Sequence, residues 1–394
     1  MFGFLVDRLP AGRTVTHFGR FVIAFVGFRI FPIVIFVVTH DSRLPIPGPA
    51  LLDRHGPCSY FIPMTKKYKV VVTDFLTHAP ETEKRILGDI ATVDVLLASN
   101  EDELLGKIDE ADAVMIYHTL KFSARSIERL KHCKLIVRCG VGYDNVDAAA
   151  ARARGIAVAN VPDYGTEEVA DSAIGMTLAL TRGIALYSSV LRDPAADWSH
   201  AQASPVWRLR GRVFGIVGLG RIGSAAALRA KSLGMEVVFY DPYCPDGRDK
   251  ALGVRRVETF DELLSQAHVL SMHCPLTEET RHIVNAVTIE KLPRGSFLVN
   301  TSRGGVVDTS AIPAAIASGR LAGAGIDVLA HEPPPADDPL IVAWRDPKHP
   351  AHHRLIVNPH AAFYSEEGLM DMRIKGSEAC RRALLGLPLR NVVN

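Results

Sequence analysis

The sequence predicts an α/β protein with two Rossmann-like, doubly wound parallel-sheet domains, one of them discontinuous in sequence. Its length of 394 residues favours two cores rather than one. From Lys69 onward, short β-branched runs alternate with helical stretches, as they do in βαβ units. Two series of this kind are present, and the mostly apolar residues 166–192 lie between them.

The first 63 residues do not share this alternation. Residues 21–38 form an apolar run near membrane-spanning length, but Arg29 and Pro32 interrupt it. An arginine near mid-bilayer costs roughly 2.5 to 3.5 kcal/mol. A stretch rich in Pro and Gly follows, and MTKKYKVVVTDF, which begins at Met64, is typical of the start of a cytosolic protein. We therefore expect residues 1–63 to be an N-terminal extension outside the functional fold, with a membrane anchor as the alternative.

The first series predicts five strands in one open sheet. They are KVVVTDF, TVDVLLAS, AVMIY, KLIVRCG and IAVAN, separated by segments such as EDELLGKIDE and SARSIERLKH that carry charge on one helical face. Residues 365–386 also have a helical pattern, and they follow the second series without being needed by it. We expect this helix to cross back, so that residues 64–165 plus 362–394 form one domain and residues 166–361 form the other.

Residues 166–192 are expected to form one long helix. Thr166 is a suitable N-cap, and Glu167 and Glu168 complement the helix dipole in the first turn. The segment is too apolar to be a solvated linker. It is therefore either a core helix or a helix at a domain or subunit interface.

The second series predicts six strands, VFGIVG, EVVFYD, HVLSMH, SFLVN, AGIDV and LIVNP. The first strand runs into GLGRIG at residues 218–223 and then into a helix, which is the context in which G-x-G-x-x-G binds a dinucleotide. Gly218 permits the tight turn, Gly220 lets backbone N–H groups approach the pyrophosphate, and Gly223 allows the helix to pack closely on the strand.

Asp241 indicates which dinucleotide this site accepts. It ends the strand EVVFYD, 18 residues past Gly223. A carboxylate at this position accepts hydrogen bonds from the ribose hydroxyls and repels a 2′-phosphate, so we expect NAD (NADH) in preference to NADP. The alternative is an aspartate that only begins the DPY turn. Arg221 and Ile222, between the glycines, complete the expected contacts of this motif.

Composition argues against several other functions. Lys and Arg total 45 against 43 for Asp and Glu, so no strong field attracts nucleic acid or an anionic membrane. The six cysteines form no C-x-x-C pair and no metal spacing, as is usual for thiols in a reducing compartment. KHPAHHR, at residues 348–354, lacks the Cys or carboxylate spacing of a metal site. We expect a cytoplasmic protein without a metal, a nucleic-acid partner or membrane association.

Three polar residues follow late strands of the second sheet, where open α/β sheets bind their ligands. They are Arg303, Glu332 and His360. Taken singly, each has a purely structural interpretation: Arg303 as a surface cation, Glu332 as a charge in a loop and His360 as a capped residue at the end of a strand. Together, in a chain that binds NAD, they supply what reduction of a carbonyl requires. A guanidinium polarises the keto oxygen and forks onto a carboxylate, a histidine moves the proton, and a carboxylate beside the histidine stabilises the imidazolium.

At these residues the sequence resembles the D-isomer-specific 2-hydroxyacid dehydrogenase family, in the motifs NTSRGGVVD, IDVLAHEPP and NPHAAFYS. The resemblance covers nearly everything from Met64 to Asn394. Within the family the chain looks closest to the C-terminal binding protein branch, through RCGVGYDNVD, GIAVANVP, FYDPYCPDG and HAAFYSEEG. The resemblance implies an NAD-dependent reduction of a small 2-keto acid to a D-2-hydroxy acid. It also implies that the substrate-binding (catalytic) domain is flavodoxin-like, and that residues 166–361 bind NAD, with residues 166–192 as the interface helix.

The resemblance also implies roles for single residues. His360 is the expected acid/base, Glu332 its partner and Arg303 the substrate anchor. Across the cleft, the side chain of Arg138 and the backbone of Val141 and Gly142 are expected to hold the carboxylate. The residues expected to line the nicotinamide side are Cys274, Thr301, Ser302 and Asp327, and Asp327 is expected to bond the carboxamide.

Two departures bear on the function. Phe363 stands where the corepressor branch has Trp after the catalytic His-Ala-Ala, which keeps an apolar wall and removes an indole donor. HCPLT, at residues 273–277, contains the Pro-Leu-Thr of metabolic dehydrogenases, which favours an enzyme. The alternatives are an NAD(H)-sensing, corepressor-like scaffold that acts through protein partners and, less favoured, a dehydrogenase tethered through residues 21–38. We expect a homodimer.

Two further histidines are candidates for the site. His331, next to Glu332, is a rival for the acid/base role, but His360 fits the motif better. His118, after the strand AVMIY, lies where the first domain could face the cleft. Its spacing supports no further assignment.

Overall fold

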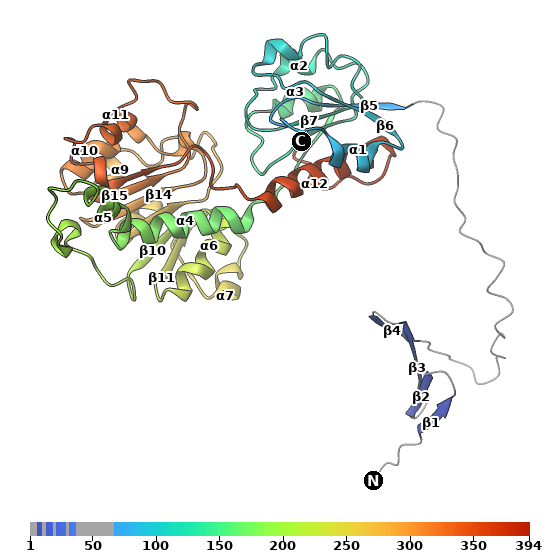
Figure 1. Cartoon of the computed structure of the whole chain (residues 1–394), viewed down its shortest axis with the longest axis horizontal. Coiled ribbons are helices and arrows are strands. Elements are labelled where there is room, and N and C mark those ends of the chain that lie inside the picture. Colours follow the sequence, from blue (N-terminus) through green and yellow to red (C-terminus); the bar gives the residue numbers. More distant parts are fainter. Residues whose placement is uncertain (1–5, 10–12, 19–20, 29–30, 37–66) are drawn as a thin grey trace. The chain divides into compact units, whose positions relative to one another are not determined.

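The computed structural model describes residues 6–9, 13–18, 21–28, 31–36 and 67–394. By its contacts the chain divides into two units, Met1–Pro63 and Met64–Asn394, each described by itself (Figure 1). The described residues of the first unit form an antiparallel sheet in the order β1-β2-β3-β4. These strands are β1 (Val6–Leu9), β2 (Arg13–Phe18), β3 (Phe21–Phe28) and β4 (Phe31–Phe36).

The apolar run predicted at residues 21–38 is therefore β3 and β4 where it is described, and not a helix. The rest of the prediction for residues 1–63 lies mostly outside the described residues. Across the described part of the chain, no helix on its own has the length and apolar character needed to cross a membrane; only the helices Thr166–Thr181 and Ile184–Val190, taken together across a bend of 60°, have that length and composition.

The second unit contains two parallel sheets, which confirms the predicted fold class. The first has the order β6-β5-β7-β8-β9, which is the 2-1-3-4-5 order of doubly wound sheets such as flavodoxin. Its strands are β5 (Tyr68–Val72), β6 (Ala91–Val95), β7 (Ala113–Ile116), β8 (Leu135–Arg138) and β9 (Ala157–Asn160). Every residue of β7 and β8 is buried, because helices cover both faces of a parallel sheet.

The second sheet has the order β12-β11-β10-β13-β14-β15-β16, whose first six strands follow the Rossmann order 3-2-1-4-5-6. All its pairings are parallel. Its strands are β10 (Val213–Val217), β11 (Glu236–Tyr240), β12 (Arg255–Arg256), β13 (Val269–Met272), β14 (Ser296–Asn300), β15 (Leu321–Ile326) and β16 (Leu355–Val357). The six predicted strands are present, and the short edge strand β12 was not predicted.

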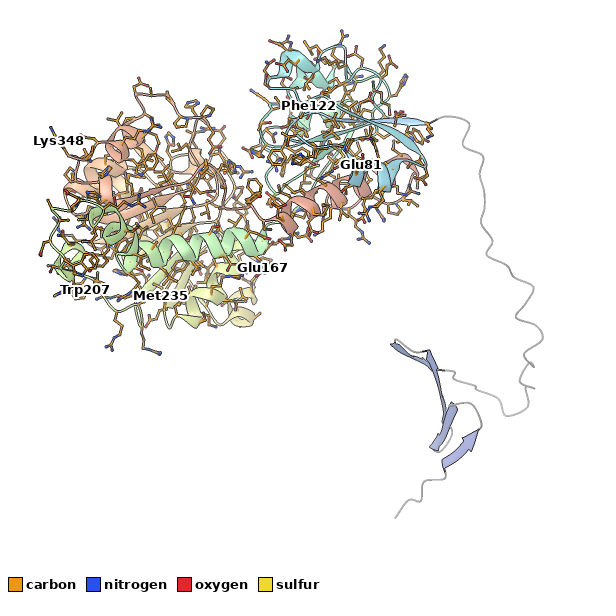
Figure 2. All side chains as sticks on the ribbon, viewed as in Figure 1. Glu81, Phe122, Glu167, Trp207, Met235 and Lys348 are labelled. Carbon is orange, nitrogen blue, oxygen red and sulfur yellow. The ribbon has the colours of Figure 1, made fainter. Side chains whose placement is uncertain are left out.

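The helices pack on the faces of both sheets. Side chains fill each layer, as at the buried Phe122 beside the first sheet and Met235 beside the second (Figure 2). Around the first sheet the helices are α1 (Glu81–Leu87), α2 (Ala124–Ile127), α3 (Ala148–Ala153) and α12 (Glu366–Leu384). Along the rest of the chain they are α4 (Thr166–Thr181), α5 (Ile184–Val190), α6 (Arg221–Ser232), α7 (Arg248–Leu252), α8 (Phe260–Leu264), α9 (Ala286–Ile289), α10 (Ile312–Ala317) and α11 (Pro339–Arg345).

The single long helix predicted for residues 166–192 is wrong, because it is broken into α4 and α5. Gly183 has φ of +68°, a left-handed conformation that ends a helix, and a Cβ there would lie 2.7 Å from the Cβ of Ala203. The predicted N-cap is also wrong. Gly165 caps α4, and Thr166 is already its first helical residue.

The last helix, α12, packs against α1 and against strands β7 and β8 of the first sheet. Ser365 caps it by accepting a hydrogen bond from the N–H of Gly368 at 2.8 Å. Arg373 forms two hydrogen bonds of 2.8 Å with the buried carboxylate of Glu83 on α1. This pair holds the C-terminal helix to α1.

Candidate active site

The loops at the carboxyl ends of the second sheet and the loops after β7 and β8 line one cavity of about 520 Å³. It brings together most of the residues that the sequence singled out. On the cofactor side they are Gly220, Arg221, Ile222, Cys274, Thr301, Ser302 and Asp327, and on the substrate side Arg138, Val141, Gly142, Arg303, His360 and Phe363. Glu332 lines an adjoining cavity of about 300 Å³ that shares Arg138, Arg303 and His360. Gly218, Gly223 and Asp241 lie outside both linings and shape the loop instead.

The glycine-rich loop has the geometry that a dinucleotide requires. Gly218 has φ of +91°, and a Cβ there would lie 2.8 Å from the backbone N of Cys274. A Cβ at Gly223 would lie 2.1 Å from the carbonyl oxygen of Gly218. At Gly220 a Cβ would meet nothing within 4 Å, so the N-terminus of α6 is open on this side. Backbone N–H groups at an open helix N-terminus bind phosphate, and the residues present therefore fit a dinucleotide.

Asp241 follows the end of β11 and holds this loop in place. Its carboxylate accepts hydrogen bonds from the N–H of Leu219 at 2.8 Å and from the N–H of Tyr243 at 3.0 Å. The same carboxylate thus orders the turn beside the phosphate site and stands where a ribose is expected.

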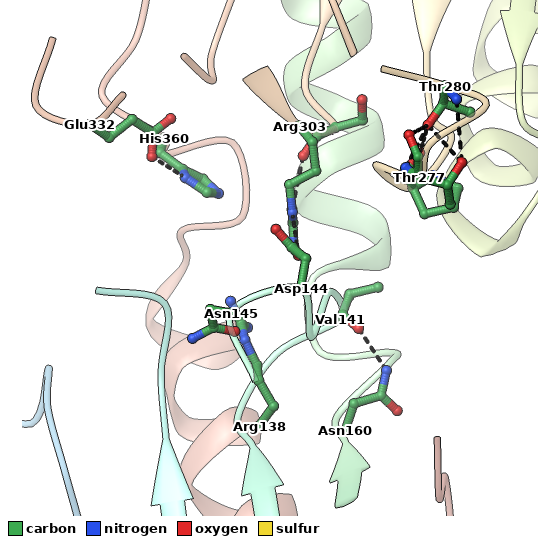
Figure 3. A network of polar contacts seen from close by, with 12 residues as sticks. Arg138, Val141, Asp144, Asn145, Asn160, Thr277, Thr280, Arg303, Glu332 and His360 are labelled. Carbon is green, nitrogen blue, oxygen red and sulfur yellow. Dashed lines mark hydrogen bonds and ion pairs between the residues drawn. The ribbon is translucent and has the colours of Figure 1, made fainter. Parts of the chain in front are cut away.

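His360 and Glu332 form a hydrogen-bonded pair (Figure 3). The distance from His360 Nδ1 to Glu332 Oε2 is 2.7 Å, and Glu332 Oε1 accepts the N–H of Leu329 at 2.8 Å. Burial acts to raise the pKa of Glu332, but the hydrogen bond and charge of His360 outweigh it and hold that pKa below its ordinary value. The carboxylate of Glu332 is therefore ionised next to the imidazole. Because the pairing uses Nδ1 of His360, the other ring nitrogen, Nε2, is free of it.

Asp327 fixes the loop that carries the histidine. Its buried carboxylate accepts hydrogen bonds from the N–H groups of Ala361 at 2.9 Å and Ala362 at 3.0 Å, and its carbonyl oxygen accepts the N–H of His360 at 2.7 Å. These contacts stabilise His360 at φ of +52°, a backbone conformation that residues other than glycine seldom adopt. Sequence reasoning missed this role, since Asp327 was expected only to bond the carboxamide.

Thr301 and Cys274 line the expected nicotinamide side. Thr301 Oγ1 is buried and has no hydrogen-bond partner among the described residues, so it is available to a bound molecule. Burial raises the pKa of the Cys274 thiol to about 12. Cys274 is therefore protonated near neutral pH and serves as a small apolar wall.

Arg303 is held by two contacts that leave part of its guanidinium free. Its Nε donates to Asp144 Oδ1 at 3.0 Å and its Nη1 donates to the carbonyl oxygen of Ser302 at 2.9 Å (Figure 3). A Cβ on Gly142 would lie 1.6 Å from Arg303 Nη2, so the guanidinium lies against the backbone of the loop after β8. Sequence reasoning missed Asp144, although the motif RCGVGYDNVD contains it. Only the fold brings it to a residue 159 positions away.

Arg138, at the end of β8, is a buried cation without an anionic partner among the residues that the structure describes. Its side chain donates only a 3.3 Å hydrogen bond to the carbonyl oxygen of Cys139, and its Nε is unsatisfied. Burial, with the nearby charge of Arg303, lowers its pKa. A buried guanidinium in this state strongly favours binding of an anion.

His118 also lines both cavities, although its spacing gave no reason to assign it. Its ring centroid lies 5.4 Å from that of His360 and 5.6 Å from that of Phe363. Burial, with a smaller contribution from Arg138, lowers the pKa of His118 to about 4. At neutral pH the site therefore contains a second, uncharged imidazole.

The histidine pKa values predict an acid-sensitive fold. Burial also lowers the pKa of His273 to about 4. The unfolded chain binds protons at both histidines near pH 6.5, so stability is lost as the pH falls from 6.5 towards 4, by at most about 2 kcal/mol per histidine at pH 5. Thermal unfolding of the cofactor-free protein should show a midpoint several degrees lower at pH 5.0 than at pH 6.5. His273→Gln should reduce that difference, and equal midpoints at the two pH values would contradict the assignment.

Comparison with known proteins adds independent information. A family model described as D-isomer specific 2-hydroxyacid dehydrogenase, NAD binding domain, matches residues 174–362. C-terminal-binding protein 1 of Caenorhabditis elegans is 36% identical over 356 residues, which is 88% of this chain and 48% of that protein. D-3-phosphoglycerate dehydrogenase of Methanocaldococcus jannaschii is 34% identical over 326 residues, which is 83% of this chain and 59% of that protein. The chain thus spans about half the length of the curated relatives it matches.

Solved structures match over nearly their full length. The TT0316 protein of Thermus thermophilus is 31% identical with a TM-score of 0.71, over 83% of this chain and all of that chain. The D-lactate dehydrogenase of Aquifex aeolicus, complexed with NAD and lactic acid, is 26% identical with a TM-score of 0.72, over 80% of this chain and 96% of that chain. The two-sheet unit that contains the cavity is therefore shared with these proteins.

Proposed function

The chain belongs to the D-isomer-specific 2-hydroxyacid dehydrogenase family, and from that premise we propose that it is an NAD-dependent 2-keto acid reductase that forms a D-2-hydroxy acid. One observation carries the proposal. His360, Arg303 and Gly220 of the glycine-rich loop line one cavity, and Glu332, which pairs with His360, lines the cavity that adjoins it. Bound NADH supplies the hydride that reduces the keto carbon.

His360 provides the proton in this mechanism. With Nδ1 bonded to the carboxylate of Glu332, its Nε2 donates a proton to the keto oxygen as the alcohol forms. Glu332 then balances the charge of the imidazolium that donates, and takes no proton itself. In the reverse direction the neutral imidazole removes the hydroxyl proton. Asp327 acts through the backbone of this loop, because its hydrogen bonds keep the imidazole in place.

Two arginines hold the substrate carboxylate. Arg138 is buried without an ion pair among the described residues, and the carboxylate would supply its missing partner. Arg303 is oriented by Asp144 and has its Nη2 against the backbone of Gly142, so a carboxylate that binds the free part of this guanidinium would also lie near the loop. Arg303 also polarises the keto oxygen, because a fixed cation stabilises the negative charge that develops there.

The same proposal assigns the parts of the chain. Residues 64–165 plus 362–394 form the substrate-binding domain and residues 166–361 the NAD-binding domain, while residues 1–63 lie outside the catalytic fold. The exposed side chains of Trp198 and Trp207 are apolar surface, and Trp207 lines a cavity with Ala185 and Leu186 of α5; such exposed apolar surface favours a homodimer. A cytoplasmic location accords with its cysteines, five of which are free thiols where described.

Asp241 is proposed to set the preference for NAD over NADP. A carboxylate near a 2′-phosphate costs roughly 2 to 4 kcal/mol, so kcat/KM should favour NADH over NADPH by roughly 30-fold to 1000-fold. Asp241→Asn removes the charge and keeps only one of the two oxygens that accept the N–H groups of Leu219 and Tyr243, and it should narrow this ratio by at least tenfold. Asp246→Asn, at an exposed aspartate nearby, is the matched control. A ratio that Asp241→Asn leaves unchanged would contradict the assignment.

The proposed function is tested by turnover. The purified chain is mixed with NADH and a panel of glyoxylate, pyruvate, hydroxypyruvate, a branched keto acid and a thioether keto acid, and absorbance is followed at 340 nm. Oxidation of NADH that requires a keto acid supports the proposal. Binding of NADH without oxidation by any member of the panel contradicts it.

The likeness to C-terminal-binding protein 1 favours a second candidate function, an NAD(H)-sensing scaffold that acts through protein partners. In that case NADH should tighten self-association of the chain, measured by sedimentation velocity with and without NADH. Turnover of keto acids should be negligible in the same preparation.

A further inference from the structure

His118 occupies the wall of the cavity that faces the acid/base. Its ring contacts those of His360 and Phe363, and on its other side that of Phe75, with a centroid separation of 5.1 Å. Both phenyl rings meet it edge-on, at interplanar angles of 61° and 67°. The two ring nitrogens form no hydrogen bond with any residue in the described part of the chain. His118 thus lies at the cavity wall between two phenyl rings and the imidazole of His360, and its hydrogen-bonding capacity is unused by the described residues.

The buried carboxylate of Asp74 fixes the position of His118. Asp74, after β5, accepts hydrogen bonds from the N–H of Tyr117 at 2.9 Å and the N–H of Thr119 at 3.2 Å, which are the residues on either side of His118. The hydroxyls of Thr73 and Thr119 also donate to it. Asp74 is wholly buried. The loop is therefore held on both sides of the histidine, as expected where a side chain must meet a ligand at one fixed point.

The substrate pose of the proposed function leaves one group without a partner. The carboxylate lies at Arg138, Arg303 and the loop at Gly142, and the keto oxygen lies at His360. The remaining substituent on the keto carbon, which begins with the third carbon of the acid, therefore faces the rest of the wall. That wall includes His118 and Phe363, and of these two only His118 can form a hydrogen bond.

We infer that His118 is a specificity-determining residue, which hydrogen-bonds a hydroxyl on the third carbon of the 2-keto acid and so selects a 3-hydroxy-2-keto acid over its alkyl counterpart. The inference rests on the proposed function. A neutral imidazole is both a donor and an acceptor, and it matches a hydroxyl, which is also both. The low pKa of His118, caused first by burial, keeps the ring in this form near neutral pH.

Selection by such a ring has a clear physical origin. When an alkyl group replaces the hydroxyl, the bound substrate covers the imidazole without offering its nitrogens a partner, and this loss weakens binding of the alkyl substrate. An ethyl side chain has nearly the same size as a hydroxymethyl group. The apolar rings alone would therefore discriminate little between the two.

The test compares hydroxypyruvate with 2-oxobutanoate, which differ by a hydroxyl and a methyl on the same carbon. The wild-type protein should prefer hydroxypyruvate by at least roughly tenfold in kcat/KM. His118→Phe keeps a ring and removes the nitrogens. It should lower kcat/KM for hydroxypyruvate by roughly ten- to a hundredfold and change the value for 2-oxobutanoate by less than about threefold. His118→Asn, which keeps a donor and an acceptor, should retain part of the preference.

His132→Phe is the matched control, because His132 is an exposed histidine of the same sheet region and should alter neither rate. NADH binding, followed by fluorescence, and thermal unfolding should be close to wild type in both Phe variants. Equal losses on both substrates in His118→Phe, or no loss on either, would overturn the inference. So would a wild-type protein that reduces 2-oxobutanoate as well as hydroxypyruvate, although the proposed function would then stand. A wild-type protein that reduces no keto acid overturns the proposed function itself, and the inference with it.

Discussion

Replacing His360 by asparagine should lower kcat for keto acid reduction by roughly a hundred- to ten-thousandfold, because the proton must then come from water. Asparagine is the suitable replacement here, since it tolerates the left-handed backbone that His360 adopts at φ of +52°. The loop hydrogen bonds of Asp327 go to backbone N–H groups and should survive the change. NADH binding, measured by fluorescence titration, should therefore stay within about twofold of wild type.

The matched control is His331→Asn, in the exposed loop next to Glu332. This variant should keep its activity, because His331 has no part in the proposed proton transfer. A large loss in His331→Asn, together with a small loss in His360→Asn, would reverse the assignment of the two histidines. Loss of NADH binding in His360→Asn would point to a collapsed site rather than to a missing proton donor.

Replacing Arg303 by alanine should have the second large effect. Two charge-assisted hydrogen bonds, to the carboxylate and to the keto oxygen, contribute roughly 3 to 6 kcal/mol, so kcat/KM should fall by roughly a hundred- to ten-thousandfold. The loss should appear in kcat as well as in KM, because charge on the keto oxygen develops only as the hydride is transferred. Steady-state kinetics with NADH at saturation measures both.

Arg303→Lys should recover only part of the activity, because an ammonium is a point charge and cannot fork onto a carboxylate. Arg294→Ala, at an exposed arginine whose guanidinium meets the carbonyl oxygen of Ser318, is the control and should leave the kinetics unchanged. If Arg303→Ala changed KM alone, the arginine would anchor the substrate without stabilising the transition state, and the proposed polarisation of the keto oxygen would be wrong.

Much of the fold could be predicted from the sequence because parallel strands buried on both faces are continuous apolar runs. β14 is an example, since SFLVN was predicted at the bounds observed and all five of its residues are buried. The glycine-rich loop was predictable for a related reason. The backbone requires glycine at two of its positions. Gly218 has a positive φ, and at Gly223 a Cβ would lie 2.1 Å from a carbonyl oxygen.

The break between α4 and α5 could not be predicted, because an isolated glycine in a helical pattern is usually tolerated. What decides at Gly183 is the close approach of Ala203, a contact from another segment. Helices such as α2 and α9 are only four residues long, which is too short for a helical period to be detected.

Some residues of the candidate site could likewise be predicted from the sequence, and others could not. Arg303, Glu332 and His360 follow strands of one sheet, so strand order alone predicts that they meet. Asp144 and His118 belong to the other sheet, and only the closure of the whole unit brings them to this cavity. Asp327 was placed at the site, but its contacts with the backbone of Ala361 depend on a loop conformation that no sequence pattern indicates.

The central claim is that His360, Glu332 and Arg303 lie where a 2-keto acid receives a hydride from NADH. It is tested most directly by incubating the chain with hydroxypyruvate and NADH deuterated at both C4 positions, and then determining the isotope content and configuration of the product. The expected product is D-glycerate that carries one deuterium on its second carbon. Recovered hydroxypyruvate with no deuterated product, or an alcohol without deuterium at that carbon, would contradict it.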